Sequence, residues 1–322
     1  MRAFPAAFMQ YSRVAETIAA DVISSYSSSF SLASRILDEP VRTHIRNIYG
    51  MVRVADEIVD GAASGAGLSA ERVLDVLDEY ERSTLTALQD GFSPDLILQA
   101  FTNTARWAEI NTQHIRDFFH SMRLDAHSAA SCGPTSYTSR EAAEYIHGSA
   151  GVIGWMCNAV FLKTSEANGR VLTDAEKQTT ERAAYALGSA FQKVNFLRDY
   201  RHDSAALARF YLPQLVDGGL TEQAKTAIVQ EIRSELRTAQ GGIHLLPEQA
   251  FSGVVLAHDL FAELTEKLDR TPAHVIARER VRIPNRHKLR IVARAQLRVT
   301  GRRFRPSTSP MESSSRLGHP SR

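Results

Sequence analysis

Cysteine is nearly absent from this sequence: two occur among 322 residues, Cys132 and Cys157. A fold that depends on a disulfide framework is therefore excluded, and a reducing compartment is favoured. Long apolar runs are missing too. The longest stretch without Asp, Glu, Lys, Arg or His, 148–162, has 15 residues, whereas a membrane span needs about 20 apolar residues. Because the first 16 residues also lack the sustained apolar core of a secretory signal, we expect a cytoplasmic protein.

Proline is absent between Pro134 and Pro213, and no segment shows the alternation of polar and apolar residues typical of a strand. Long helices need such a proline-free interval. Apolar residues recur at three- and four-residue steps, as on amphipathic helices. We predict helices through the stretches 41–59, 73–88, 96–119, 173–197, 224–236 and 254–268.

Helix starts and one loop can also be located. Thr138 precedes Glu141, and Thr173 precedes Glu176, at the spacing of a capping box. The glycine-rich segment 61–67 is predicted to be a loop. These features predict an all-α fold in a single domain.

The net charge of +2 conceals an asymmetry. Residues 1–277 hold 25 basic and 34 acidic residues, a net charge of −9, whereas residues 278–322 hold 13 basic and 2 acidic residues, a net charge of +11. Residues 306–322 include too few apolar residues to pack against a folded domain. We therefore expect one domain at 1–305, followed by a disordered basic tail at 306–322.

Two pairs of aspartates point to chemistry. Asp56 and Asp60 are four residues apart, and so are Asp199 and Asp203. On a helix this spacing places both carboxylates on one face, one turn apart, where they repel each other. Mg²⁺ would relieve the repulsion, because it prefers oxygen ligands and commonly binds through one or two carboxylates plus substrate phosphates.

A simpler interpretation of each pair is a solvated helix face, which is more common for a single Asp-x-x-x-Asp motif. Here both pairs end apolar helical stretches, and each has an arginine close by, Arg53 and Arg198. Carboxylates and guanidinium groups around a metal fit a polyanion such as a phosphate. The surroundings therefore favour a magnesium and phosphate site over a solvated face.

At these residues the sequence resembles the squalene/phytoene synthase family of head-to-head prenyl transferases, and bacterial phytoene synthases within it most closely. The resemblance extends to about residue 295. It rests on five segments in order: Ser-x-Ser-Phe at 27–30, Tyr49 with the motif at 53–60, a glycine-containing helix at 145–154, the motif at 192–203, and Tyr-Leu-Pro at 211–213.

The resemblance implies an isoprenoid-synthase helical bundle around a central cavity, with the two aspartate motifs facing each other across its mouth. It implies on the order of two or three Mg²⁺ ions, which Mn²⁺ could replace. The implied metal ligands are Asp56, Asp60, Asn195, Asp199 and Asp203. The implied catalytic residues are Tyr49, Arg53 and the four motif aspartates. The implied substrate-binding residues are Ser27, Ser29, Phe30, Tyr145, Gln192, Arg198 and Tyr211.

The implied activity is a Mg²⁺-dependent prenyl transfer that joins two geranylgeranyl diphosphates into phytoene through a cyclopropylcarbinyl diphosphate, in carotenoid biosynthesis. Because the reaction ends with loss of a proton, no NADPH is expected. A squalene or dehydrosqualene synthase that uses two farnesyl diphosphates is the alternative. A non-catalytic assembly protein with the same fold is less favoured, because such a protein is expected to lose the metal ligands, which are all present here.

The chemistry of this reaction sets further requirements. Breaking an allylic C–O bond creates a carbocation and a departing diphosphate, so the cavity must be apolar and exclude water. Candidates to line it are Phe30, Tyr49, Tyr145, Phe191 and Phe196, and ordinary core packing is the alternative for each of them. Gly148, Gly151 and Gly154 would thin one helix wall, for close approach of either a ligand or another helix.

The basic C-terminal segment could bind partners other than the allylic diphosphates. Between residues 278 and 305, apolar residues lie among the basic ones, as in an interfacial helix on anionic lipid. A terminal helix that packs on the acidic body fits equally well, so peripheral contact with the inner membrane face stays open. Nucleic acid is not expected, because no recognition motif accompanies the arginines. The sequence leaves the oligomeric state open.

Overall fold

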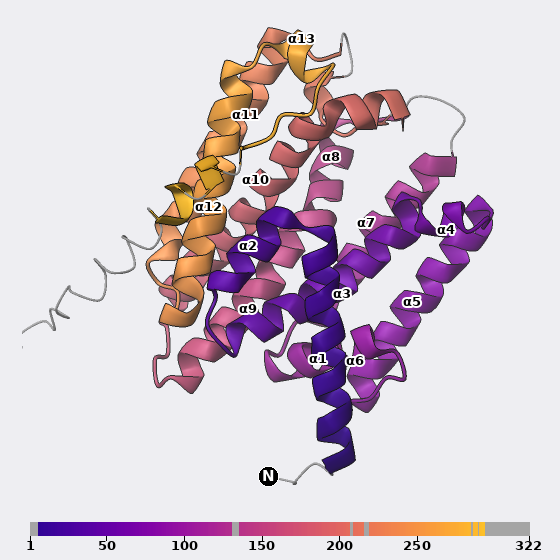
Figure 1. Cartoon of the computed structure of the whole chain (residues 1–322), viewed down its shortest axis with the longest axis vertical. Coiled ribbons are helices and arrows are strands. Elements are labelled where there is room, and N and C mark those ends of the chain that lie inside the picture. Colours follow the sequence, from indigo (N-terminus) through magenta and orange to yellow (C-terminus); the bar gives the residue numbers. More distant parts are fainter. Residues whose placement is uncertain are drawn as a thin grey trace, which may run out of the picture.

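The computed structural model of this chain is predominantly helical, which confirms the predicted all-α fold (Figure 1). It describes residues 6–130, 135–206, 209–215, 219–284, 286–288 and 290–293, without the side chains of residues 28–29, 128–130, 135–136, 202–206 and 209–210. The helices are α1 Ala6–Tyr26, α2 Ser28–Ile36, α3 Val41–Asp60, α4 Ala62–Gly65, α5 Ala70–Asp90, α6 Leu96–Trp107, α7 Thr112–Ala130, α8 Ser139–Ile146, the π-helical turn η1 His147–Gly151, α9 Val152–Ala167, α10 Asp174–Ala206, the 3₁₀ turn η2 Pro213–Leu215, α11 Glu222–Ile243, α12 Glu248–Arg270 and α13 Ala273–Ile276. Two short parallel strands also pair, β1 Thr135–Ser136 and β2 Arg209–Phe210.

Both predicted capping boxes are present. The Thr138 hydroxyl accepts a hydrogen bond from the Glu141 amide at 3.3 Å, and the Glu141 carboxylate accepts one from the Thr138 amide at 2.8 Å. Thr173 and Glu176 make the same two bonds at the start of α10, at 3.3 and 2.9 Å. These bonds satisfy amide groups that a helix start otherwise leaves without partners, so the sequence sets where α8 and α10 begin.

Two local predictions are corrected by the structure. The stretch 96–119 is not one helix, because a turn separates α6 from α7. In this turn Glu109 has a φ of 54°, in the left-handed region that ends a helix. The Asn111 side chain then accepts a hydrogen bond from the Gln113 amide at 2.9 Å, which caps the start of α7. The segment 61–67, predicted as a loop, contains the short helix α4.

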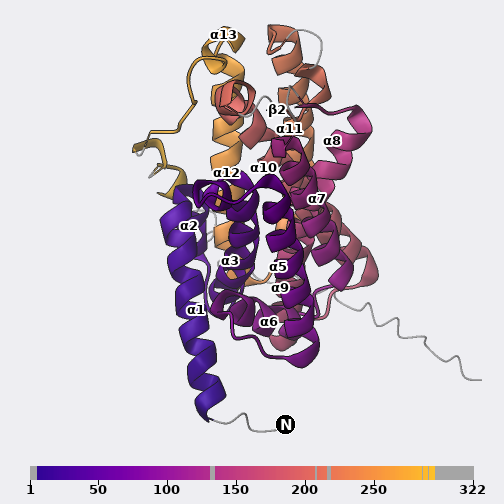
Figure 2. The same cartoon turned by 90° about the vertical axis from the view of Figure 1, so that its right-hand side faces the viewer.

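The helices surround a central cavity, whose wall comes mainly from α2, α3, α9, α10 and α12. Helix α1 runs along one edge of the bundle and packs on α3 and α6 (Figure 2). A large apolar core joins α1, α2, α3, α5, α6, α7, α9 and α12, and a second joins α8, α10, α11, α12 and α13. The two cores hold the cavity-forming helices in place from both sides.

Glycine residues allow α10 to pack closely against α9 and the π-helical turn before it. A Cβ atom placed on Gly154 would lie 2.2 Å from the carbonyl oxygen of Ala184, and one on Gly188 would lie 2.3 Å from that of Ala150. Real Cβ atoms do not approach backbone oxygens this closely, so only glycine permits this helix contact. The glycines of the central helix therefore serve close helix packing, one of the two purposes predicted for them.

The described part of the basic C-terminal segment packs on the body of the protein. Val281 and Ile291 are 7% and 6% exposed, and Ile291 belongs to the larger core. The predicted tail at 306–322 lies outside the described residues, as do residues 294–305. None of the described helices combines the length and the apolar character that crossing a membrane requires.

Candidate active site

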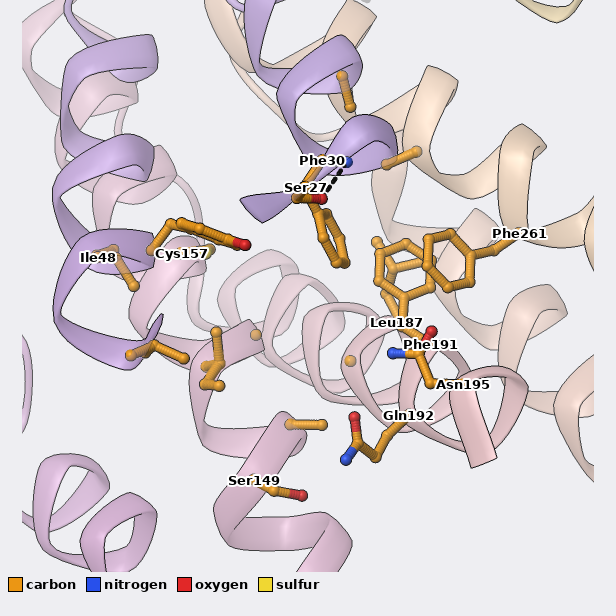
Figure 3. A pocket seen from close by; sticks show the side chains of 18 of the residues that line it. Ser27, Phe30, Ile48, Ser149, Cys157, Leu187, Phe191, Gln192, Asn195 and Phe261 are labelled. Atoms are coloured by element: carbon orange, nitrogen blue, oxygen red, sulfur yellow. Dashed lines mark hydrogen bonds between the residues drawn. The ribbon is translucent and has the colours of Figure 1, made fainter. Parts of the chain in front are cut away.

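A cavity of about 1180 Å³ lies at the centre of the bundle. Its wall carries carboxylates and arginines near the C-terminal ends of α3 and α10, and mostly apolar and aromatic side chains elsewhere. Along α10 the lining runs from Thr180 to Arg201, a distance of about 32 Å at 1.5 Å per residue. Figure 3 shows Ile48 and Cys157 on one side of this space and Phe261 on the other.

The first acidic pair lies at the end of α3. Arg53 lies 2.5 Å from an Asp56 carboxylate oxygen and also pairs with Glu57. Although 31% of the Asp56 side chain is reachable by solvent, the surrounding protein and the nearby Asp60 charge raise the pKa of Asp56 to about 7. The helix therefore holds two carboxylates together where their joint ionisation is unfavourable.

The second acidic motif lies at the end of α10. Asp199 pairs with its neighbour Arg198 at 2.5 Å and with Arg280 at 2.6 Å. Asn195 and Gln192 lie on preceding turns of the same helix and line the cavity (Figure 3). One face of α10 thus presents a carboxylate, two amides and an arginine to the same space as the α3 carboxylates.

The mouth of the cavity carries oxygen atoms that could bind a metal ion. Among the described residues, no three His, Cys, Asp or Glu side chains converge closely enough to hold one, and the Asp203 side chain is not described. The donors that line the cavity are the carboxylate and amide oxygens of Asp56, Asp60, Asp199 and Asn195. This all-oxygen set, with a carboxylate pair that resists joint ionisation, fits a hard divalent cation such as Mg²⁺.

Ser27 and Tyr49 join the start of α2 to α3. Ser27 caps α2 by accepting a hydrogen bond from the Phe30 amide at 3.1 Å (Figure 3). Tyr49 hydrogen bonds with the Ser27 side chain, and burial raises the pKa of the Tyr49 phenol. The guanidinium of Arg53 lies 4.6 Å above the centre of the Tyr26 ring. These contacts fix the polar groups on the α2 and α3 side of the mouth.

Aromatic rings form two parts of the wall. Phe191 stacks on Phe261 with ring centres 3.7 Å apart, and Phe30 lies 5.7 Å from each of them (Figure 3). The second group contains Tyr145, Phe196 and Tyr211, with Tyr211 stacked on Phe196 at 4.4 Å and on Tyr145 at 4.9 Å. Such faces can stabilise a positive charge inside a water-poor cavity.

The end of the cavity away from the aspartates, near Cys157, Asn158 and Thr180, has few polar groups. Burial raises the pKa of the Cys157 thiol to about 12, so this thiol stays protonated. Asn158 donates a hydrogen bond to the Thr180 hydroxyl at 3.3 Å, while its carbonyl oxygen has no protein partner among the described residues. This end offers little that could bind a charged group.

The cavity brings together most of the residues that the sequence singled out. The predicted site residues that line it are Ser27, Phe30, Tyr49, Arg53, Asp56, Asp60, Tyr145, Gln192, Asn195, Arg198, Asp199 and Tyr211. The side chains of the other two, Ser29 and Asp203, are outside the described residues. The two further aromatic candidates, Phe191 and Phe196, also line the cavity.

No sequence pattern marks Phe261 and Arg280, which line the cavity, or Asp125, which binds two of its lining residues from behind. Phe261 belongs to a stretch that was predicted as an amphipathic helix, but nothing in the pattern told a cavity ring from a core ring. Arg280 was assigned to the basic C-terminal segment, and its pairing with Asp199 depends on tertiary structure. Asp125 carried no motif, yet both Tyr145 and Tyr211 donate hydrogen bonds to it.

Comparison with known proteins adds independent findings. The family model described as squalene/phytoene synthase matches residues 23–287. A bifunctional lycopene cyclase/phytoene synthase of Phaeosphaeria nodorum is 26% identical over 265 residues, which cover 75% of this chain and 44% of that protein. A chloroplastic phytoene synthase 2 of Oryza sativa is 30% identical over 206 residues, which cover 63% and 47%. The chain spans about half the length of these curated relatives.

Solved structures show a similar fold. A dehydrosqualene synthase with a bound ligand has a TM-score of 0.70 and 17% identity, covering 91% of this chain and 99% of the other. A squalene synthase from Alicyclobacillus acidocaldarius has a TM-score of 0.64 and 17% identity, covering 80% and 94%. At this identity the likeness concerns the arrangement of the helices.

Proposed function

Because this chain belongs to the squalene/phytoene synthase family, we propose that it is a prenyl transferase that condenses two allylic isoprenoid diphosphates head to head. One observation carries the proposal: a single cavity combines a mouth of carboxylates and arginines with a long, largely apolar and aromatic interior. The mouth suits a diphosphate with its metal ions, and the interior suits a hydrocarbon chain and a carbocation.

The polar mouth would hold the leaving group. We assign Mg²⁺ binding to Asp56, Asp60, Asn195, Asp199 and Asp203, on the order of two or three ions, with Mn²⁺ able to replace them. The chemistry that Mg²⁺ supplies when bound is neutralisation of the diphosphate charge. Further contacts to the phosphates are assigned to Ser27, Ser29, Tyr49, Arg53, Gln192 and Arg198, which carry hydrogen-bond donors.

The apolar interior would protect the cation. When the allylic C–O bond breaks, its electron pair leaves with the diphosphate, and a carbocation remains that water would destroy. Aromatic faces stabilise it without adding a nucleophile. We assign this part of the work to Phe30, Phe191 and Phe261 on one wall and to Tyr145, Phe196 and Tyr211 on the other.

Geranylgeranyl diphosphate is the proposed substrate, and phytoene the proposed product, as in carotenoid biosynthesis. A double bond of the second substrate attacks the cation, and loss of a proton gives a cyclopropylcarbinyl diphosphate. A second ionisation, a rearrangement and loss of another proton complete the product, without NADPH. The curated relatives named phytoene synthase support this choice. A twenty-carbon prenyl chain, about 20 Å long with C–C bonds of about 1.5 Å, also fits the length of the cavity.

The substrate assay tests this proposal directly. The purified full chain is incubated with Mg²⁺ and either geranylgeranyl or farnesyl diphosphate, with and without NADPH, and the hydrocarbons are identified by mass. We expect phytoene from the longer substrate and no response to NADPH. Good turnover of farnesyl diphosphate without turnover of the longer substrate would instead establish the squalene or dehydrosqualene alternative. No turnover of either would favour the non-catalytic alternative.

We also propose that the protein acts in the cytoplasm, at the inner face of the membrane, because its hydrocarbon product cannot enter water. Lipid contact is assigned to the basic C-terminal segment at 278–305, in which Val281 and Ile291 pack on the body and Arg282, Arg286 and Arg290 are exposed. Deleting residues 296–322 should weaken binding to vesicles that contain anionic lipid, with vesicles of neutral lipid as the control. Unchanged binding would remove this role from residues 296–322.

A further inference from the structure

A buried carboxylate on α7 links two tyrosines of the cavity wall. Asp125 is 3% exposed. One of its oxygens accepts a hydrogen bond from the Tyr145 hydroxyl at 2.5 Å, and the other accepts one from the Tyr211 hydroxyl at 3.0 Å. The partners come from α8 and from the segment after β2, 20 and 86 residues away in sequence. The carboxylate thus joins three separate segments of the chain.

The two tyrosines present their rings to the cavity. Both line it, and their ring centres lie 4.9 Å apart in a stacked arrangement. Tyr211 also lies flat on Phe196, with 9° between the ring planes, and Tyr137 lies behind it at 5.5 Å. Tyr145 lines the same cavity as Asp60, and burial, Asp125, Tyr211 and Asp60 together raise the pKa of its phenol. This aromatic wall therefore adjoins the acidic mouth.

An ionised carboxylate at this buried position carries a large desolvation cost. Withdrawing a charge from water costs several kcal/mol unless strong hydrogen bonds compensate, and a neutral acceptor such as Asn could hold a hydroxyl at lower cost. The 2.5 Å bond from Tyr145 has the length typical of a charge-assisted hydrogen bond. A phenol that donates to an anion carries more electron density in its ring. Because cations are attracted to the electron-rich faces of aromatic rings, this density is useful beside a carbocation.

We infer that Asp125 is a positioning residue for the condensation: it fixes the Tyr145 and Tyr211 rings against the cavity and makes their faces more attractive to the cationic intermediate. The inference rests on the proposed function and deepens it. Asp125 acts through the tyrosines and does not itself line the cavity. Its effect belongs to the chemical step, so it should leave substrate binding nearly unchanged.

The kinetic test uses the full chain and the substrate that the wild-type protein turns over. Asp125→Asn keeps the size and removes the charge. We expect kcat to fall by about tenfold or more, as loss of a cation–π contribution implies, with KM nearly unchanged. Ser121→Ala is the matched control, because Ser121 is fully buried one turn earlier on α7 and its hydroxyl donates to the Phe118 carbonyl. It should keep the wild-type kcat.

Combined variants show whether Asp125 acts through the tyrosines. In a background of Tyr145→Phe and Tyr211→Phe, adding Asp125→Asn should cause little further loss of kcat, since residues that act as a unit are not additive. Fully additive losses would overturn the inference. If Asp125→Asn does not fold, the single variants Tyr145→Phe and Tyr211→Phe test the inference instead. Each should lower kcat, and wild-type kcat in both would overturn the inference.

A spectroscopic measurement separates this inference from the proposed function. A phenol that donates to a carboxylate absorbs at longer wavelength than one that donates to a neutral acceptor. The near-ultraviolet difference spectrum between the wild-type protein and Asp125→Asn should therefore show a tyrosine shift that Ser121→Ala lacks. If no diphosphate is turned over, the proposed function fails and this shift still tests the contacts. No shift overturns the inference whatever the activity.

Discussion

Arg280 pairs with Asp199 across 81 positions of the sequence. Its Nε lies 2.6 Å from one carboxylate oxygen, and its Nη2 donates a hydrogen bond to the other at 3.2 Å. Asp199 also pairs with Arg198. The segment that follows α13 therefore closes one side of the cavity mouth with a positive charge, beside the residues proposed to bind the diphosphate.

Replacing Arg280 with Gln should raise KM for the diphosphate substrate by about tenfold, the size of one charge-assisted contact to a phosphate. Steady-state kinetics measure this, and circular dichroism should show an unchanged helical content. Arg282→Gln is the control, because the Arg282 side chain is exposed two residues further on. Equal KM values for Arg280→Gln and the wild type would contradict a role in binding.

Asp56→Asn should lower turnover by at least about 10³-fold, because the paired carboxylates of α3 are proposed metal ligands. A second measurement does not need turnover. Mg²⁺ with inorganic diphosphate should raise the Tm of the wild-type protein, since a ligand that binds the folded state stabilises it, and should leave the Tm of the variant unchanged. Asp78→Asn, at an exposed ion pair with Arg123, should retain both properties. A full Tm response in Asp56→Asn would remove this residue from the metal site.

Gly154→Ala should destabilise the fold by about 2–3 kcal/mol, because its Cβ would overlap the Ala184 carbonyl oxygen and force the two helices apart. Urea unfolding measures the loss. Gly241→Ala is a matched helical control: a Cβ there meets no atom within 4 Å, so the change should stabilise by up to about 1 kcal/mol. Similar effects of the two substitutions would show that the α9–α10 contact is looser than described.

His44 should make stability depend on pH. Its ring stacks on Trp107 at 4.1 Å and a ring nitrogen lies 2.9 Å from the Thr104 hydroxyl oxygen. Burial lowers the pKa of His44 from 6.5 to about 4. Between these values the unfolded chain binds more protons than the folded one, so the contribution is complete above pH 6.5 and falls as the pH drops toward 4.

The expected loss from this group is about 1–2 kcal/mol between pH 7.5 and pH 5. Urea unfolding of His44→Phe, which keeps an aromatic ring against Trp107, should show that much less pH dependence than the wild type. His274→Gln, at an exposed position of α13, should behave as the wild type does. Identical pH dependence in His44→Phe would show that folding leaves the pKa of His44 unchanged.

Cys157→Phe should change the preferred chain length. Cys157 lines the cavity on α9, so a larger side chain occupies space that a longer hydrocarbon needs. We expect kcat/KM for geranylgeranyl diphosphate to fall by about tenfold relative to that for farnesyl diphosphate, roughly the effect of a few lost methylene contacts. Cys157→Ala should not lower this ratio. A ratio that Cys157→Phe leaves unchanged would place the hydrocarbon elsewhere.

The sequence predicts those features of the site that depend only on residues close to each other in the chain. Asp56 and Asp60 share a helix face because four residues make about one turn, and Thr138 caps α8 by a rule that needs only its neighbours. The resemblance to a family supplied the expectation that the two motifs share one cavity. Arg280 and Asp125 could not be predicted, because their roles depend on which distant segments meet. The turn at Glu109 was missed because an apolar periodicity continues across it.

The position of Arg280 also sets an order of assembly. A chain that is still being synthesised can form the α3 and α10 carboxylate groups before residue 280 has been added. Until then the mouth lacks the Arg280 charge that offsets Asp199. The site is therefore completed late, by a segment close to the end of the described chain. Truncations before residue 280 should yield helical proteins with an excess of negative charge at the mouth.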